Sequence, residues 1–254
     1  MIGVYKHFVT DTGIKVPTIT AEQMREVDRV ATEETGPILY QMMENAGRNL
    51  ASMAIEILGQ QWQRAAIVVL AGGGGNGGGG ICAARHLANR NLNVTLSLTA
   101  PHRLQQVNAL QYQIFQCTSG QRVDIDDLDT LPRPDLILDA VLGYGLQSAP
   151  HGTALKLIQW ANSTMAPILS LDLPSGVNAT TGETPGEFIH AQWTMTLALP
   201  KTGLVPKKTG HLVLADIGIP EGVYRQLSLP YRSPFDDRFR VPLMEPLLLT
   251  RRVA

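Results

Sequence analysis

Three oxygen-bearing side chains, Asn76, Asp139 and Ser175, stand among glycines or at the end of an apolar run. Amide, carboxylate and hydroxyl oxygens suit a hard cation, and the sequence has no cluster of Cys or His for a softer metal. Ordinary turn chemistry explains the same residue types, because Asn can hold a left-handed turn and Asp or Ser can cap a helix. The residue types therefore leave a cation site and simple turns both open.

The stretch 71–80 places eight glycines around Asn76. It follows the apolar run Ala65–Leu70 and precedes the helix-like segment Ile81–Leu87. Without Cβ atoms, such a loop lets a ligand lie against backbone N–H groups, and the following helix offers its positive N-terminal end. A flexible linker is the alternative, but linkers seldom stand between a buried strand and a helix. We therefore expect a site for an anion, most often a phosphate.

Two common glycine motifs do not fit this loop. The phosphate loop of nucleoside triphosphatases needs Gly-Lys-Ser/Thr, whereas the chain has Gly80-Ile81-Cys82. The dinucleotide pattern is matched by Gly72, Gly74 and Gly77, but the next strand ends in 98–101 without the acid that binds a ribose. Ordinary hydride transfer is disfavoured, while Arg103 leaves a 2'-phosphate binder open.

Apolar runs alternate with helical periodicities along most of the chain. We expect helices after the capping box 20–23 and over 38–58, 81–87, 104–115 and 154–161, and strands over 65–70, 94–98, 136–139, 168–171, 193–198 and 212–215. This alternation predicts a mostly parallel sheet covered by helices on both faces. Ligands bind beyond the carboxyl ends of such strands, so segments 72–80, 139–146 and 172–176 should converge at one edge.

The composition mainly excludes classes of partner and of protein. The chain has 254 residues, of which 44% are hydrophobic, and a formal net charge of -1. This charge favours neither nucleic acid nor an anionic membrane surface as a partner. Cys82 and Cys117 suggest no disulfide framework, and no signal peptide or membrane-spanning run is present, so we expect a cytoplasmic protein. Residues 231–254, rich in Pro and Arg, are expected to be a linker or tail after a domain over 1–230.

Five motifs in this order resemble the YjeF N-terminal domain family, the NAD(P)H-hydrate epimerases, from about Ile19 to about Pro220. They are Met43–Gly47, Asn76–Leu87, Asp139–Leu146, Asp172–Gly176 and Asp216–Pro220. The resemblance implies an α/β fold, a Rossmann-like three-layer α/β/α sandwich. It also implies an isomerase that interconverts the R and S forms of NADH or NADPH hydrated at C6 of the nicotinamide ring, as a step of metabolite repair.

Site residues follow from the resemblance by motif position. A potassium ion would be held by Asn76, Asp139 and Ser175. The substrate, an NAD(P)H hydrate, would contact Asp172 and two loops, consisting of Gly75, Asn76, Gly77, Gly78 and Gly79 and of Gly143, Tyr144, Gly145, Leu146, Gln147, Ser148 and Ala149. The S epimer would pass to an ADP- or ATP-dependent dehydratase, separate or fused. The chain stops before such a domain, so we expect no dehydratase activity, and the apolar N-terminal helices could serve a homodimer.

The chemistry of such a substrate points to one carboxylate. A C6 hydrate is a hemiaminal, and acid-assisted loss of its hydroxyl leaves an iminium carbon that water can attack from either face. A nearby carboxylate could protonate the leaving oxygen, stabilise the cation and deprotonate the returning water. Asp172 is the candidate for these roles. Ring opening and reclosure is a second route that the sequence does not separate from the first.

The chain departs from the family at two positions. The family's turn usually reads Asn-Asn-Gly-Gly-Asp-Gly, whereas Gly75 and Gly79 stand here in place of the first Asn and the Asp. This loss slightly favours a non-catalytic nucleotide-binding or scaffolding domain, as in the decapping-enhancer scaffolds. A conventional NAD(P)-dependent oxidoreductase is the other alternative. Lys201, after the strand over 193–198, could meet a phosphate or be solvated.

Overall fold

The computed structural model describes residues 7–104 and 106–245, and their strands form one sheet. The strands are β1 His7–Thr10, β2 Lys15–Pro17, β3 Ala66–Ala71, β4 Asn93–Leu98, β5 Gln121–Arg122, β6 Leu136–Ala140, β7 Ile168–Leu171, β8 Trp193–Leu197, β9 His211–Ala215 and β10 Arg240–Met244. Their order is β2-β1-β10-β9-β8-β7-β6-β3-β4-β5. Neighbours from β9 to β5 are parallel, whereas β10, β1 and β2 are added antiparallel.

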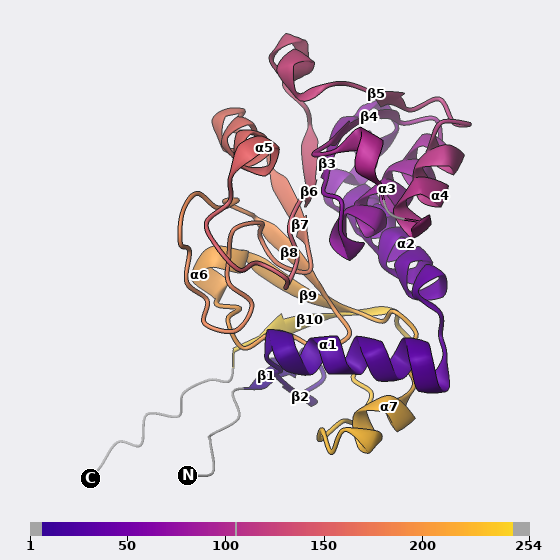
Figure 1. The fold of residues 1–254 in the computed structure, drawn as a ribbon, viewed down its shortest axis with the longest axis vertical. Coiled ribbons are helices and arrows are strands. Elements are labelled where there is room, and N and C mark those ends of the chain that lie inside the picture. Colours follow the sequence, from indigo (N-terminus) through magenta and orange to yellow (C-terminus); the bar gives the residue numbers. More distant parts are fainter. Residues whose placement is uncertain (1–6, 105, 246–254) are drawn as a thin grey trace.

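Helices cover both faces of the parallel part of the sheet. The α-helices are α1 Ala21–Val30, α2 Leu39–Leu58, α3 Gly75–Ala88, α4 Gln106–Phe115, α5 Gly152–Ser163, α6 Pro206–Thr209 and α7 Glu221–Gln226. Shorter helical turns are η1 Ala31–Thr35, η2 Gly59–Arg64, η3 Pro101–Arg103 and η4 Ile125–Thr130. In Figure 1, α2, α3 and α4 lie on one side of the sheet and α5 on the other. The predicted three-layer α/β/α arrangement is confirmed.

The central strands are mostly apolar because both of their faces are covered. Val69 of β3 packs in the cluster that contains Leu50 of α2 and Ile81 of α3, and the adjacent Val68 packs with Ile158 of α5. Successive side chains of a strand point to opposite faces, so one run of valines supplies both layers of core. This double burial fits the interior position of β3, between β6 and β4.

The winding of the sheet reverses beside β3. The chain runs from β3 outward to β4 and β5, and then returns to place β6 on the other side of β3. Loops that leave β3 and β6 therefore diverge to opposite faces, and a crevice opens between their carboxyl ends. This is the edge where we expected the three polar segments to converge.

The glycine stretch differs from the expected loop. Helix α3 begins at Gly75, so only residues 72–74 form the loop and the remaining glycines form the first turns of the helix. A Cβ atom at Gly77 would lie 1.8 Å from the carbonyl oxygen of Gly72, and one at Gly80 would lie 2.5 Å from Cβ of Ala140. Close packing of α3 against β3 and β6 thus overrides the low helix propensity of glycine.

Part of the segment expected to be a linker or tail belongs to the sheet, because residues 240–244 form β10. Within it, β10 pairs with β9 and β1, and Val241 and Leu243 are buried. The boundary at 230 was wrong for this part of the chain, while residues 246–254 lie outside the described residues. Pro242 and the surrounding arginines hid an alternating strand pattern, since proline usually argues against a strand interior.

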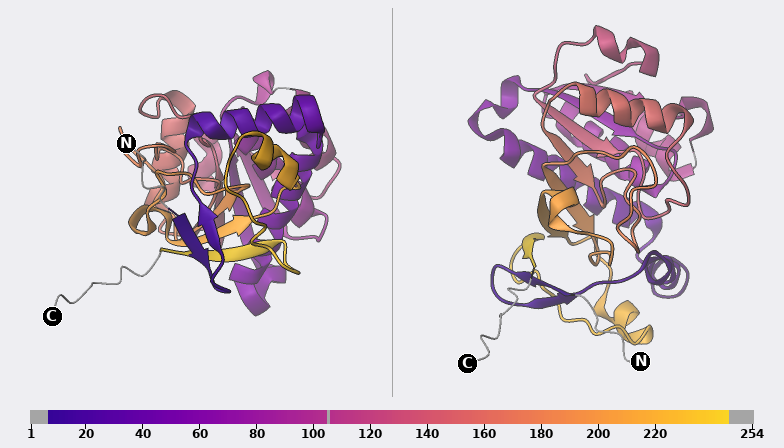
Figure 2. Two further views of the ribbon diagram at one scale, coloured as in Figure 1. Left: turned by 90° about the horizontal axis from the view of Figure 1, so that it is seen from below. Right: turned by 90° about the vertical axis from the view of Figure 1, so that its left-hand side faces the viewer.

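A further cluster of buried side chains packs against the antiparallel strands at one end of the molecule. There α1 and α7 lie side by side (Figures 1 and 2), and Val27 of α1 and Val223 of α7 are buried in one cluster with Val241 of β10. The predicted capping box is present, because Thr20 Oγ1 accepts from Gln23 N–H and Gln23 Oε1 accepts from Thr20 N–H. This packing places α1 along the crevice.

In the described part of the chain, the helices are too short or too polar to cross a membrane. The cytoplasmic location stays a prediction.

Candidate functional site

A pocket of about 740 Å³ opens at the sheet edge where the winding reverses. Its walls come from α1, α2, the N-terminal end of α3 and the loops after β3, β6, β7 and β8. The predicted site residues that line it are Gly75, Asn76, Gly79, Gly143, Tyr144, Gly145, Leu146 and Asp172. Of the other predicted substrate contacts, Gly77 and Gly78 are buried in the first turn of α3, and Gln147, Ser148 and Ala149 do not line the pocket.

The N-terminal end of α3 faces this pocket with Gly74, Gly75 and Asn76. The first N–H groups of a helix have no partner within the helix, and together with the helix dipole they attract an anion. Asn108 of α4 fixes the preceding loop, because its Nδ2 donates to the carbonyl oxygens of Gly73 and Gly74, at 2.9 Å each. No motif in the sequence indicates this role of Asn108, which lies on a separate helix.

Two of the three oxygen-bearing residues of the expected cation site, Asp139 and Ser175, are hydrogen-bonded to each other beside β6. Both oxygens of Asp139 accept hydrogen bonds, from the hydroxyls of Ser170 at 2.7 Å and Ser175 at 2.5 Å and from the N–H groups of Val141 and Ser175. Burial raises the pKa of Asp139 above its usual range, against these hydrogen bonds, which lower it. Among the described residues, no Lys or Arg forms an ion pair with this carboxyl group.

Asn76 lies beside the loop that follows β6. A Cβ atom at Gly143 would be 3.2 Å from Cβ of Asn76. The amide oxygen and nitrogen of Asn76 are buried without a hydrogen-bond partner among the described residues. A buried polar group without a partner costs about 1–3 kcal/mol, so this amide points to a ligand that supplies the missing contact.

Asp172 forms a buried ion pair with Lys201, and both residues line the pocket. The Oδ1 atom of Asp172 accepts from Lys201 Nζ and, at 3.3 Å each, from Thr196 Oγ1 and Leu197 N–H. Lys201 Nζ also donates to the carbonyl oxygen of Leu197 at 3.0 Å. The side chains of Lys201 and Asp172 are only 1% and 5% exposed. Both alternatives for Lys201, a phosphate contact and a solvated side chain, missed this buried ion pair.

Asp172 has a left-handed backbone conformation, which sets the direction of its side chain. Its φ is +65°, which is uncommon for a residue other than glycine, Asn or Asp. The backbone N–H of Asp172 donates to the carbonyl oxygen of Met195 at 2.7 Å, so the turn is fixed against β8. Strained backbone of this kind is found at functional sites more often than elsewhere, which agrees with the place of Asp172 on the pocket wall.

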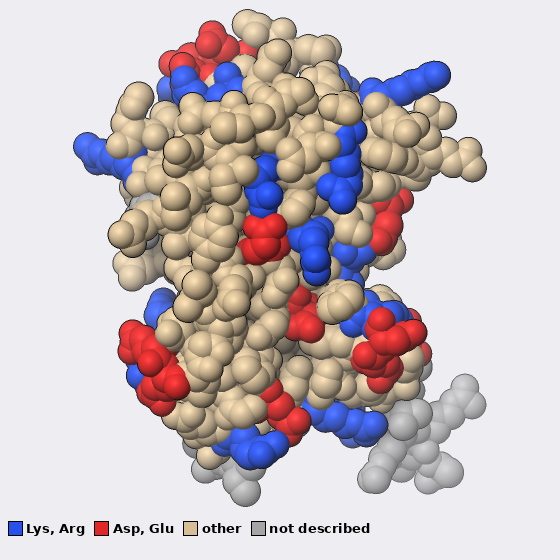
Figure 3. Space-filling model, turned by 90° about the vertical axis from the view of Figure 1, so that its right-hand side faces the viewer, with Lys and Arg blue, Asp and Glu red and all other residues tan. Residues whose placement is uncertain are grey.

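A second cavity of about 790 Å³ lies between α2, α3 and the start of β10. Four arginines, Arg48, Arg90, Arg238 and Arg240, line it, and none of the predicted site residues does. Arg238 is paired with Asp11 and Arg240 with Glu56. Figure 3 looks onto the side of the molecule where α2, α3 and α4 lie in Figure 1, and shows Lys and Arg side chains with Asp and Glu side chains among them. The ion pairs of Arg238 and Arg240 indicate a solvated face there.

The cluster of Glu44, Cys82 and His86 links α2 to α3. Their ligand atoms lie within 4.8 Å of one another, a spacing compatible with a metal. The guanidinium of Arg85 already supplies the positive charge, with Nη2 2.5 Å from Glu44 Oε2 and 3.4 Å from Cys82 Sγ. Burial raises the pKa of Cys82 to about 12, which keeps the thiol protonated. The cluster is therefore best explained as a connection between helices.

Comparisons with known proteins agree with the fold and with the family that the five motifs resemble. The family described as YjeF-related protein N-terminus matches residues 39–203. An NAD(P)H-hydrate epimerase of Dehalogenimonas lykanthroporepellens is 49% identical over 237 residues, which are 93% of this chain and 96% of that protein. The crystal structure of the yeast protein YNL200c superposes with a TM-score of 0.76 at 19% identity, covering 90% of this chain and 99% of that one.

Two longer proteins also match. The bifunctional NAD(P)H-hydrate repair enzyme Nnr of Moorella thermoacetica is 37% identical over 80% of this chain and 41% of its own length. The human enhancer of mRNA-decapping protein 3 is 32% identical over 95% of this chain and 47% of its own length. The chain thus spans less than half of these two relatives.

Proposed function

Because the chain belongs to the YjeF-related protein N-terminus family, we propose that its sheet-edge pocket is the active site of an NAD(P)H-hydrate epimerase. The observation that carries this proposal is the pocket itself, which joins the open N-terminal end of α3 to the buried carboxyl group of Asp172. A diphosphate suits the first feature, and a ring that becomes positively charged during reaction suits the second.

The reaction inverts one carbon of the nicotinamide ring. Protonation of the C6 hydroxyl breaks its bond to carbon and releases water, which leaves an iminium ion between C6 and the ring nitrogen. Water then adds to the other face of C6 and returns a proton. The carboxylate of Asp172, ion-paired with Lys201, stabilises the iminium ion by its negative charge in a pocket of low polarity.

A potassium ion fits the residues around β6. The amide of Asn76 lacks a partner, the carboxyl group of Asp139 is buried without a counter-charge among the described residues, and Ser175 adds a hydroxyl oxygen. These are hard oxygen donors. When bound, potassium would supply a positive charge that balances Asp139. Asn76, Asp139 and Ser175 would hold it, and so tie the loops after β3, β6 and β7 together.

The epimerase would work with other proteins of cofactor repair. An ADP- or ATP-dependent dehydratase, separate or fused, would consume the S epimer, as the name of the Nnr relative suggests. We place this activity in the cytoplasm, with a homodimer as the assembly formed by the N-terminal helices.

A coupled assay tests the proposal. The protein is mixed with the R-hydrate and an S-specific dehydratase, and recovery of NADH is followed against the spontaneous rate. Wild-type protein should accelerate recovery, and Asp172→Asn should lower kcat by about 100-fold or more, since fixed electrostatic groups supply factors of this size. Asp129→Asn, which changes an exposed carboxylate away from the pocket, is the matched control. Wild-type recovery at the spontaneous rate would refute the epimerase.

The second candidate is a nucleotide-binding scaffold. It is favoured by Gly79, where the family's turn has Asp, and by the similarity to decapping protein 3. Tight binding of NADPH without acceleration of the epimerisation would support it.

A further inference from the structure

We infer that Asp28 is a second catalytic residue, which carries the proton to and from the C6 hydroxyl while Asp172 stabilises the iminium ion. This inference rests on the proposed function. It divides between two carboxyl groups the roles that the sequence had assigned to Asp172 alone.

Asp28 reaches the pocket from α1. Both Asp28 and Asp172 line the cavity, together with Lys201 and Tyr144. The hydroxyl of Tyr144 donates to Asp28 Oδ2 at 2.5 Å, which joins α1 to the loop after β6. The ring of Tyr144 in turn lies 5.9 Å from Lys201 Nζ, the partner of Asp172. The two carboxyl groups therefore belong to one polar wall.

The two carboxyl groups differ in what they are bonded to. Asp172 accepts from an ammonium, a hydroxyl and a backbone N–H, all on the same oxygen. Asp28 has only the neutral hydroxyl of Tyr144 as a partner for its carboxyl group among the described residues, and it forms no ion pair there. Its Oδ1 accepts no hydrogen bond within the same residues, so this oxygen is free to hold a transferable proton.

The surroundings of Asp28 keep it protonated more readily than an exposed aspartate. Burial raises its pKa and the charge of Asp172 raises it further, while the Tyr144 hydrogen bond and the charge of Lys201 lower it; the net direction is upward. Arg25 and Arg29 stand on the same helix, and buried Tyr224 approaches from α7.

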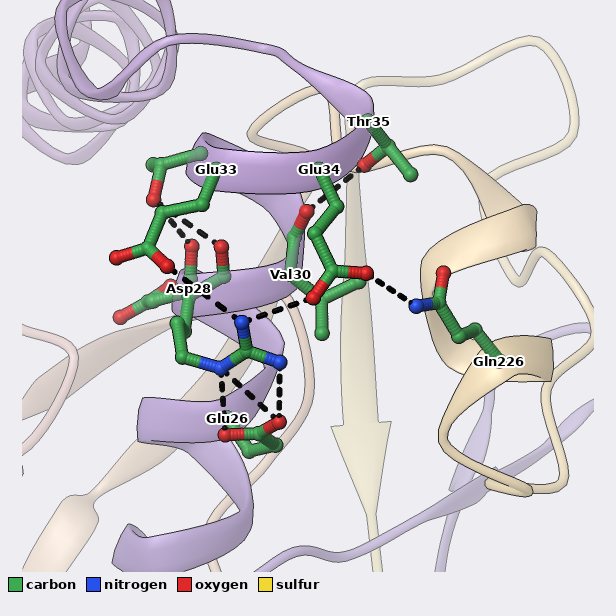
Figure 4. A network of polar contacts seen from close by, with 9 residues as sticks. Glu26, Asp28, Val30, Glu33, Glu34, Thr35 and Gln226 are labelled. Atoms are coloured by element: carbon green, nitrogen blue, oxygen red, sulfur yellow. Dashed lines mark hydrogen bonds and ion pairs between the residues drawn. The ribbon is translucent and has the colours of Figure 1, made fainter.

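Arg29 forms its ion pairs with residues other than Asp28. Its guanidinium pairs with Glu26 at 2.7 Å and with Glu34 at 2.8 Å, and Glu34 accepts from Gln226 of α7 (Figure 4). Thr32 Oγ1 also donates to the backbone carbonyl oxygen of Asp28 at 2.8 Å. These contacts fix α1 and leave the side chain of Asp28 without a cationic partner on its own helix.

The proton balance of the proposed step is complete. The carboxyl group of Asp28 gives its proton to the C6 hydroxyl, and the C–O bond breaks with both electrons going to the departing water. A water molecule then adds to the opposite face of C6 and returns one proton to the Asp28 carboxylate. The residue ends in its starting form, and only the configuration at C6 has changed.

The pH dependence of kcat tests the assignment. The acid must be protonated, so the wild-type rate above the spontaneous one should fall as pH rises through the raised pKa of Asp28. Asp28→Asn should lower kcat by about 100-fold or more with little change in KM, and should abolish this alkaline decline. Glu22→Gln, an isosteric change of an exposed carboxylate on α1 outside the pocket, is the matched control and should keep both the rate and the profile.

Tyr144→Phe provides an independent readout. Loss of the hydroxyl removes a hydrogen bond that lowers the pKa of Asp28, so the alkaline decline should move to higher pH. A merely structural role of Tyr144 would lower the rate without moving the profile. This shift also decides the matter if Asp28→Asn does not fold.

The outcomes test the role of Asp28 and the epimerase function separately. An active wild type whose rate and pH profile are unchanged in Asp28→Asn, or whose alkaline decline stays in place in Tyr144→Phe, overturns the role of Asp28 and leaves the epimerase intact. Wild-type protein without activity above the spontaneous rate refutes the proposed function, and the role of Asp28 with it.

Discussion

Lys201 Nζ donates a hydrogen bond to Asp172 Oδ1 in the interior of the protein, where the lysine side chain is 1% exposed. The two residues stand after neighbouring parallel strands, β8 and β7, so the sheet brings them together although 29 positions separate them. Lysine and aspartate are almost never fully buried unless they are paired. This ion pair therefore gives the carboxylate at the pocket a counter-charge and holds the loop after β8 in place.

Lys201→Met should destabilise the protein strongly. The substitution leaves the carboxylate of Asp172 buried without its partner, and breaking a buried ion pair from one side costs about 3–5 kcal/mol. Urea denaturation monitored by circular dichroism measures the loss. Lys156→Met, which removes an exposed pair with Asp126 at 3.4 Å, is the control and should change stability by less than about 1 kcal/mol. Equal losses in the two variants would contradict the structural role of Lys201.

Epimerisation in water enriched in oxygen-18 should place solvent oxygen at C6. Loss and return of water exchanges the hydroxyl, whereas ring opening and reclosure retains the original oxygen during the first turnover. Mass spectrometry of the product, corrected for exchange without protein, measures the incorporation. Epimerised product that retains its oxygen would assign the reaction to ring opening and remove the need for an iminium ion beside Asp172.

Much of the parallel sheet could be predicted because its strands are buried on both faces and read as apolar runs. The positions of Asp139 and Asp172 at strand ends followed from those runs, since their neighbours Leu138 and Leu171 are fully buried. The parallel register then brought both aspartates to the same edge. This part of the site depends on local patterns and on a general rule of topology.

The contacts that complete the site depend on tertiary structure. Asp28 is on a helix face that looks solvent-exposed in sequence, and its partner Tyr144 is 116 positions away. Lysine is usually an exposed residue type, yet Lys201 is buried because it forms an ion pair with Asp172. The start of α3 at Gly75 was missed because packing against Gly72 and Ala140 favours a helix that glycine propensity opposes.

Gly79→Asp should improve catalysis by restoring the acid of the family's turn. A Cβ atom at this position would lie 2.7 Å from Cδ2 of Leu171 and 3.9 Å from Cβ of Ala46, so only the end of a leucine side chain must move. Better placement of the substrate by about an ångström can raise kcat/KM by roughly 100-fold, which sets the upper limit of the gain. Gly79→Ala introduces the same steric contact without a carboxylate. A rate that falls equally in both variants would mean that the pocket has adapted to glycine.

Potassium should stabilise the folded protein if Asn76, Asp139 and Ser175 bind it. A ligand at about 100 times its Kd adds about 2.7 kcal/mol to the free energy of unfolding. Thermal melting in potassium chloride, compared with choline chloride at the same ionic strength, measures this gain. In Asn76→Ala the difference between the two salts should shrink, because the amide oxygen is lost. Identical melting temperatures in both salts for the wild type would argue against a specific site.

Glu44 should make folding sensitive to acid. Burial alone would raise the pKa of its carboxyl group, but hydrogen bonds from Arg85 and His86 outweigh burial and hold the pKa at about 2. A carboxylate whose pKa is lower in the folded state stabilises that state above the unfolded pKa, and the contribution is lost as pH falls toward 2. Glu44→Gln should therefore be less stable than wild type at neutral pH, and its stability should decline less steeply with acid. Glu22→Gln, on an exposed part of α1, should keep the wild-type acid profile in urea titrations. If Glu44→Gln keeps the wild-type slope between neutral pH and pH 2, the link between α2 and α3 through Arg85 contributes nothing to acid stability.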